Sequence, residues 1–269
     1  MTTRVYIGIP THSHSITTST VVSLLDLQAT AGPEFSLHTV FHSASVISDL
    51  RNTIVANFLA RGDDILFMLD SDQGAPAELI LRMLRSGFPV VGCLYPRRNY
   101  FWPQVDPNQR AGDMRRVTSQ AMRFVGELLP DATGNATVTN GFALARHIGG
   151  GVMIVRREVF EKLMLAYPDL AGRGFADEDE NVPLSPFNWG FFNPLPGDSK
   201  PRPLGEDISF CERWRTGCGG EIFAEVVTDN EHVGRNVFRG NFSSWLAARA
   251  PITLDGAGAA PPQSQPDSP

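Results

Sequence analysis

Residues 61–76 read RGDDILFMLDSDQGAP, and the other predicted elements are arranged around this segment. Ile65–Leu69 is an unbroken apolar run, which is typical of a parallel strand buried on both faces. Pro76 suits the first turn of a helix, and the residues that follow repeat apolar side chains at helical spacing up to Gly87. The acidic triplet Asp70–Asp72 therefore lies at the carboxyl end of a strand, where open α/β sheets bind ligands.

The two carboxylates of this triplet suggest a cation site. If the extended geometry persists past Leu69, Asp70 and Asp72 leave the strand on one side and Ser71 on the other. Two carboxylates held this close repel each other unless a cation lies between them or one takes a proton. We expect a divalent ion to lie between the two carboxylates and neutralise this repulsion. A polar turn that caps the next helix is the alternative, and the residues alone leave it open.

Strand and helix patterns alternate on both sides of the central strand. Strands are expected at 4–9, 35–41, 65–69, 89–95, 152–155 and 221–227, the first one stopped by Pro10. Helices are expected at 17–29, 43–62, 76–87, 156–164 and 205–217. The alternation predicts an α/β fold: one Rossmann-like domain over residues 1–245, with a mostly parallel central sheet, right-handed crossovers and helices on both faces.

Three segments do not follow this alternation. Residues 96–147 contain short apolar runs that fit either antiparallel strands or helical turns, and their type stays open. Residues 168–204 are rich in Pro, Gly and Asp with aromatics, which is typical of a functional loop able to cover a site. Residues 246–269 hold mainly Ala, Gly, Pro, Ser and Gln toward the end, and we expect a disordered tail.

Composition excludes several classes of protein. The net charge of −6 over 269 residues argues against nucleic-acid binding through bulk charge, because phosphate neutralisation needs clustered Lys and Arg. The three cysteines have neither zinc-site spacing nor an even count, so buried free thiols are expected. No apolar stretch is long enough for a membrane span, and the start lacks a signal-peptide pattern. A soluble cytoplasmic protein is the expectation.

Other polar or flexible groups stand at the ends of the expected elements, and each alone has an ordinary structural explanation. Arg51-Asn52 could belong to a solvated helix face, and Gly149–Gly151 to a turn before a strand. Glu206-Asp207 could reflect the preference of acidic residues for helix starts, and His232 could be a packed histidine.

Taken in order, these groups and the acidic triplet form a series that is more specific than its parts. It resembles the nucleotide-sugar glycosyltransferases of the A-type (GT-A) fold, and more closely the bacterial and phage-like members related to glycosyltransferase family two. The resemblance runs from about residue 4 to 240. Its most specific pieces are RNTIVANFLARGDDILFMLDSDQ, GGGVMIVRREVFEKL and GEDISFCERWRTG.

The resemblance implies a metal site and a catalytic base. Asp72 and His232 match the family's metal ligands, with Asp70 also in the metal motif and closer to the nucleotide, and the ion would be Mn²⁺ or Mg²⁺. Asp207 matches the carboxylate that takes the proton from an acceptor hydroxyl, which makes the transfer inverting.

The resemblance also implies a site for a nucleoside-diphosphate sugar donor, with an unknown acceptor. Its residues are Pro10, Thr11, Arg51, Asp70, Ser71, Asp72, Gly150 and Gly151. A further group could clamp the diphosphate or stack on a sugar ring, although a partly exposed loop explains it equally well; it consists of Arg97, Arg98, Tyr100 and Trp102.

Two other functions stay open beside this one. A nucleotidyltransferase uses a related sheet and an acidic metal site, but it needs a basic loop after the first strand, and PTHSHSITTS holds neither Lys nor Arg. A non-catalytic nucleotide-sugar-binding or partner-binding domain is the third reading. His12 and His14 in the same loop could form a separate metal pair or simply a polar loop.

Overall fold

The computed structural model describes residues 2–12, 14–102, 114–132, 134–175, 185–197, 202–247 and 254–255. The predicted boundary at 245 falls inside helix α7 (Phe242–Ala247), and a two-residue strand β15 (Leu254–Asp255) follows. The rest of the predicted disordered tail lies outside the described residues. Within them, no helix combines the length and the apolar character that a membrane crossing requires.

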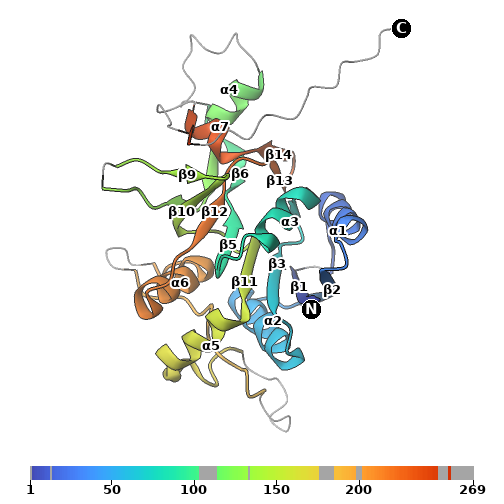
Figure 1. Cartoon of the computed structure of the whole chain (residues 1–269), viewed down its shortest axis with the longest axis vertical. Coiled ribbons are helices and arrows are strands. Elements are labelled where there is room, and N and C mark those ends of the chain that lie inside the picture. The colour runs from blue at the N-terminus through green and yellow to red at the C-terminus, as the bar shows by residue number, and fades with distance from the viewer. Residues whose placement is uncertain are drawn as a thin grey trace.

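The first half of the chain builds the predicted alternation of strand and helix. It contains β1 (Thr3–Thr11), α1 (Thr18–Thr30), β2 (Phe35–Ser43), α2 (Ile47–Arg61) and β3 (Ile65–Leu69). Strand β1 lies between β2 and β3 and is parallel to both (Figure 1).

Two details of this half test the local signals. Gly62 caps α2 in the left-handed region at φ 74°, as the predicted helix end requires. Pro10 does not stop the first strand, which continues to Thr11. The pairing of β1 with β3 ends at Gly8, so Pro10 has a strand neighbour on the β2 side only, a position that tolerates a residue without an N–H.

The main sheet has the order β15-β9-β10-β12-β5-β11-β3-β1-β2. Every strand on this path runs in the direction of β1 except β10 and β11, so the sheet is mixed although most of its strands share one direction. Strand β11 (Val152–Arg156) is antiparallel to both β3 and β5 (Val90–Cys93). The predicted α/β class is confirmed, whereas the specific A-type glycosyltransferase fold stays a prediction.

The remaining predicted elements form close to their expected bounds. They are α3 (Ala77–Arg85), α5 (Arg157–Ala166), α6 (Glu206–Glu212) with a π-helical continuation (Arg213–Gly217), and β12 (Phe223–Glu225). The region whose type was open forms mainly short strands: β6 (Tyr95–Tyr100), α4 (Met114–Ala121), β7 (Met122–Val125), β8 (Glu127–Leu128), β9 (Val138–Thr139) and β10 (Phe142–His147).

A second, three-stranded sheet lies beside the acidic triplet. It consists of β4 (Gln73–Gly74), β13 (Asn230–Val233) and β14 (Val237–Gly240) in the order β14-β13-β4. Sequence patterns do not predict it, because strands of two to four residues leave too short a periodicity.

Helices cover both faces of the main sheet, as predicted. Alternate residues of β3 belong to opposite apolar layers: Leu66 and Met68 pack with α2, α5 and α6, whereas Phe67 and Leu69 pack with α1 and α3. Fully buried Leu27 of α1 belongs to the second layer. The sheet is therefore enclosed along its parallel part, and its carboxyl edge is where polar groups gather.

Part of the predicted covering loop is packed in the core. Phe191 and Phe192 are fully buried, and Phe192 stacks on Phe210 of α6 with ring centroids 4.7 Å apart. The buried Asn52 side chain accepts a hydrogen bond from the Phe192 N–H at 2.9 Å and donates one to the Gly174 carbonyl at 2.7 Å. Residues 185–197 thus form part of the fold, and the rest of that loop, 176–184 and 198–201, lies outside the described residues.

Candidate functional site

The acidic triplet forms a tight turn rather than a continued strand. The Gln73 N–H donates to the Asp70 carbonyl at 3.1 Å, which closes the turn directly after β3. The two carboxylates consequently do not share one partner, as the extended geometry would have required. Asp70 faces Arg51, and Asp72 faces His232 and Arg98.

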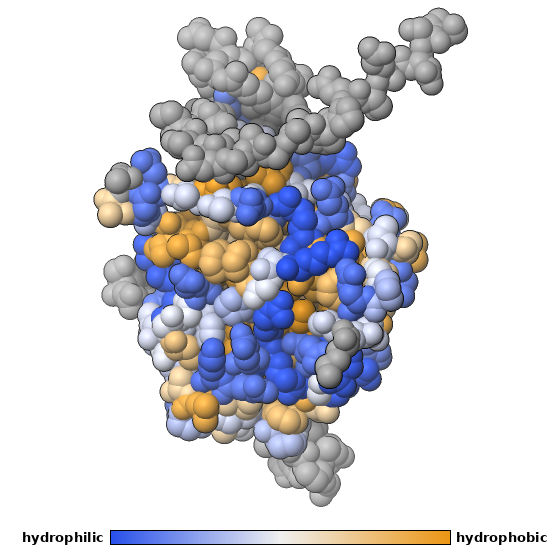
Figure 2. Space-filling view, viewed as in Figure 1, coloured by the Kyte–Doolittle hydropathy of each residue, from blue (hydrophilic) through white to orange (hydrophobic). Residues whose placement is uncertain are grey.

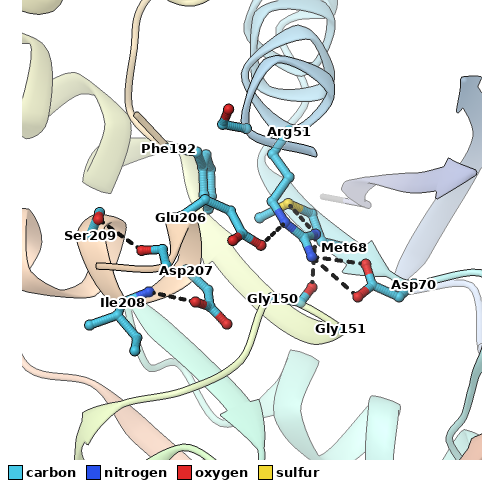
Figure 3. A network of polar contacts seen from close by, with 12 residues as sticks. Arg51, Met68, Asp70, Gly150, Gly151, Phe192, Glu206, Asp207, Ile208 and Ser209 are labelled. Carbon is cyan, nitrogen blue, oxygen red and sulfur yellow. Dashed lines mark hydrogen bonds and ion pairs between the residues drawn. The ribbon is translucent and has the colours of Figure 1, made fainter. Parts of the chain in front are cut away.

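Arg51 of α2 is the centre of a buried polar network (Figure 3). It donates to both carboxylate oxygens of Asp70 at 3.0 and 3.2 Å, to Glu206 at 3.3 Å and to the Gly150 carbonyl at 3.1 Å. Burial alone lowers the pKa of Arg51, but the Asp70 and Glu206 carboxylates outweigh it and raise that pKa above its usual range. The guanidinium therefore stays charged and joins α2, β3 and α6.

The glycine turn reaches the site because β11 is antiparallel to β3. The residues that precede β11 lie beside the carboxyl end of β3, and the Asp70 N–H donates to the Gly151 carbonyl at 2.8 Å. A Cβ atom on Gly150 would lie 2.6 Å from Arg51 Cζ, and one on Gly151 would lie 2.9 Å from the Tyr95 hydroxyl. The two glycines make room for these side chains; their predicted approach to a donor stays a prediction.

His232 and Asp72 face each other across the junction of β13 and β4. His232 Nε2 lies 3.4 Å from Asp72 Oδ2, and Nδ1 lies 2.8 Å from the Pro96 carbonyl. A carbonyl oxygen can only accept, so Nδ1 carries a hydrogen, and Nε2 is the ring nitrogen that faces Asp72. Burial raises the pKa of Asp72, but His232 and Arg98 outweigh it, and the net effect is a lowered pKa.

This pair fits a divalent cation, and the larger predicted set does not assemble. Metal-binding histidines commonly donate their second N–H to a backbone carbonyl, as His232 does toward Pro96. One carboxylate and one imidazole leave positions for phosphate oxygens and water. Both oxygens of Asp70, the third predicted ligand, are bound by Arg51. Within the described residues no group of three or more His, Cys, Asp and Glu side chains is placed to hold a metal.

Asp207 belongs to the other end of the same network. It is the second residue of α6, and its Oδ1 accepts from the Ile208 N–H at 2.8 Å. Burial raises the pKa of Asp207, the neighbouring charge of Glu206 raises it further, and Arg51 partly offsets both. A carboxylate with a raised pKa at a sheet edge is suited to accept a proton.

Tyr95, which sequence patterns do not single out, connects the two ends of the site. Its hydroxyl accepts from the Gly151 N–H at 3.2 Å, and its ring packs edge-on against His232 with centroids 5.4 Å apart. Burial raises the pKa of Tyr95, and the charges of Asp70 and Asp207 raise it further. The predicted metal pair and the predicted base therefore gather at one edge of the sheet.

A pocket of about 210 Å³ opens beside the triplet. The start of α2 forms one wall through Ile47 and Leu50, and His12 contributes from the loop after β1. The pocket is also lined by five of the predicted donor-binding residues, which are Pro10, Thr11, Asp70, Ser71 and Asp72. Residues from three separate parts of the chain thus meet around one hollow.

A larger pocket of about 480 Å³ lies elsewhere, in an apolar area over β10 and β12 (Figure 2). Phe88 and Phe223 stack there with centroids 3.7 Å apart. None of its lining residues has a titratable side chain, so this pocket offers no acid, base or charged metal ligand.

Comparison with known proteins gives distant structural similarity and no family. No protein-family profile matches the chain, and no curated protein matches it. Among solved structures, the chain is similar to the crystal structure of A197 from STIV, with a TM-score of 0.43, 13% identity and coverage of 97% of this chain and 98% of that one. It is also similar to UDP-glucose pyrophosphorylase complexed with UDP-glucose, with a TM-score of 0.38, 8% identity and coverage of 92% and 97%. Neither likeness is close enough to assign an activity to this chain.

Proposed function

We propose that this protein is a metal-dependent glycosyltransferase that moves a sugar from a nucleoside-diphosphate donor to an acceptor hydroxyl with inversion. One observation supports it most: the Asp72 carboxylate and His232 Nε2 face each other beside a pocket lined by Asp70–Asp72 and Pro10-Thr11. A nucleoside would occupy this pocket, and its diphosphate would extend toward Asp72.

Each side chain of the site would have a separate role in the transfer. Asp72 and His232 would hold Mn²⁺ or Mg²⁺, which when bound supplies positive charge to the leaving diphosphate. Arg51 fixes the Asp70 carboxylate and the Gly150 carbonyl, so the turn keeps its shape without a ligand. Asp207 takes the proton from the acceptor hydroxyl, a task that its raised pKa favours.

Binding is tested by thermal unfolding with each nucleoside diphosphate, with and without Mn²⁺. We expect one base to stabilise the protein more than the others, since the stabilisation grows with ligand concentration over dissociation constant. Asp72→Asn should remove the Mn²⁺-dependent part of the shift. Absence of any shift at millimolar ligand, or an undiminished Mn²⁺-dependent shift in Asp72→Asn, would contradict the proposal.

Product analysis separates the proposal from nucleotidyl transfer. A glycosyltransferase releases a nucleoside diphosphate from its donor and hydrolyses some donor slowly even without an acceptor. Pyrophosphate release from a nucleoside triphosphate and a sugar phosphate would instead identify a nucleotidyltransferase. Ligand binding without any turnover, across several donors with Mn²⁺, would identify a binding domain.

A further inference from the structure

The Asp72 carboxylate already forms an ion pair with a positively charged side chain of the protein, that of Arg98. Arg98 of β6 places Nη1 2.8 Å from Asp72 Oδ2, the same oxygen that His232 Nε2 faces at 3.4 Å. The stem of Arg98 crosses Gly234, where an added Cβ would lie 3.0 Å from Arg98 Cδ. The guanidinium therefore occupies the same carboxylate oxygen that a divalent ion shared by Asp72 and His232 would take.

The two cations compete for this oxygen, because two positive charges held at one atom repel each other. A guanidinium is always charged and has no lone pair to offer, so it cannot serve as a metal ligand. An ion that takes Asp72 Oδ2 must first release Arg98. The Arg98 side chain is 54% exposed, so it has room to leave.

We propose that Arg98 is an exchangeable cation that occupies Asp72 in the ligand-free protein, yields Asp72 to the divalent ion and then pairs with the donor diphosphate. The inference rests on the proposed function and adds a coupling between metal binding and nucleotide binding. A diphosphate gives the released guanidinium a charge-assisted partner, and arginine suits phosphate oxygens in a two-point contact. Metal and nucleotide therefore strengthen each other's binding by the same factor.

The ordinary explanation of the contact is a surface ion pair without a role. That explanation predicts no link between Arg98 and metal affinity beyond the loss of one positive charge nearby. Arg97 provides the matched control, because it is exposed, adjacent in the chain and carries the same charge. The comparison between these two arginines isolates the contact with Asp72.

The test is Mn²⁺ titration of the full chain, followed by the electron paramagnetic resonance signal of free Mn²⁺. Arg98→Ala should bind Mn²⁺ alone about two- to fivefold more tightly than Arg97→Ala, the range expected for breaking a partly exposed ion pair. Adding a nucleoside diphosphate should tighten Mn²⁺ binding in wild type and Arg97→Ala. It should do so less in Arg98→Ala, because the diphosphate has lost the guanidinium.

The outcomes separate this inference from the proposed function. Equal Mn²⁺ affinity in the two alanine variants, or weaker affinity in Arg98→Ala, overturns the exchange, and the metal site itself stands if Asp72→Asn abolishes binding. Mn²⁺ binding that is absent, or that is unchanged in Asp72→Asn, overturns the metal-dependent function and the exchange together.

Discussion

Arg51 binds both carboxylate oxygens of Asp70, at 3.0 and 3.2 Å, while only 2% of the arginine is exposed to solvent. The two residues are 19 apart in sequence and come from the helix before β3 and the turn after it. Glu206 approaches the same guanidinium from α6. One buried positive charge thus balances two carboxylates that belong to different elements.

Replacing Arg51 should strongly destabilise the fold. Arg51→Met leaves Asp70 and Glu206 without their counter-charge, and breaking a buried ion pair in this way costs about 3–5 kcal/mol. Urea unfolding measures the change. Arg85→Met is the control, because Arg85 and Glu34 form an exposed pair worth less than about 1 kcal/mol. Equal stability of the two variants would show that the buried network does not contribute as described.

Gly150→Ala should crowd Arg51. The new Cβ would lie 2.6 Å from Arg51 Cζ, and forcing such a contact in a packed interior costs about 1–3 kcal/mol. The matched control is Gly32→Ala, whose Cβ would have as its nearest atom Glu34 Oε2, at 3.3 Å, on an exposed side chain that can move. Thermal unfolding of the two variants side by side checks the prediction, and a stable Gly150→Ala protein would contradict it.

Asp207→Asn should remove activity and spare the fold. The amide oxygen can still accept from the Ile208 N–H, but it cannot take a proton, so transfer should fall about 10²–10⁴-fold. Glu212→Gln, at the other end of α6, should keep the wild-type rate. Unfolding temperatures of both variants should match the wild type, and a rapid Asp207→Asn enzyme would exclude the proposed base.

The pH profile of the wild type tests the same residue independently. Asp207 acts only when deprotonated, so kcat/KM should fall as pH drops through its pKa. Burial raises that pKa, which moves the acid limb to higher pH than an ordinary aspartate would give. An acid limb at the pH of an exposed aspartate would point to another group.

Alkaline pH should destabilise the protein through Tyr6. Its side chain is 1% exposed and contacts His42 Nε2 at 2.9 Å, and burial raises its pKa to about 12. Between pH of about 10 and about 12 the unfolded chain loses this proton while the folded chain keeps it. The contribution, roughly 2–3 kcal/mol, is complete below this window and is lost as pH rises through it. Unfolding of Tyr6→Phe should show a smaller pH slope than wild type; an unchanged slope would contradict the assignment.

Local signals in the sequence predict the elements well. The apolar run of β3 and the glycine that ends α2 depend on neighbouring residues only, and both form as expected. The direction of β11 does not follow from its sequence, because an apolar run reads the same in parallel and antiparallel pairing. The mostly parallel sheet is therefore confirmed, whereas the antiparallel direction of β10 and β11 within it does not follow from local patterns.

In the candidate site, too, local signals identify the residues but not their contacts. The order of polar groups along the chain indicates Asp72, Asp207 and His232, and these gather at one edge. The partner of each carboxylate depends on the turn after Leu69, a tertiary feature that no local pattern fixes. Tyr95 was missed because an aromatic residue at the end of an apolar strand is ordinarily core, and only its hydroxyl's contact with Gly151 distinguishes it.

The position of β11 in the main sheet also affects how the chain folds during synthesis. Strands β3 and β5 are complete by residue 93, yet each leaves an open edge until residues 152–156 have left the ribosome and entered between them. Unpaired edges of buried, apolar strands invite pairing with other chains. A fragment that stops before residue 152 should therefore aggregate. Extension past β11 pairs the two facing edges of β3 and β5, and the second edge of β5 is closed only by β12.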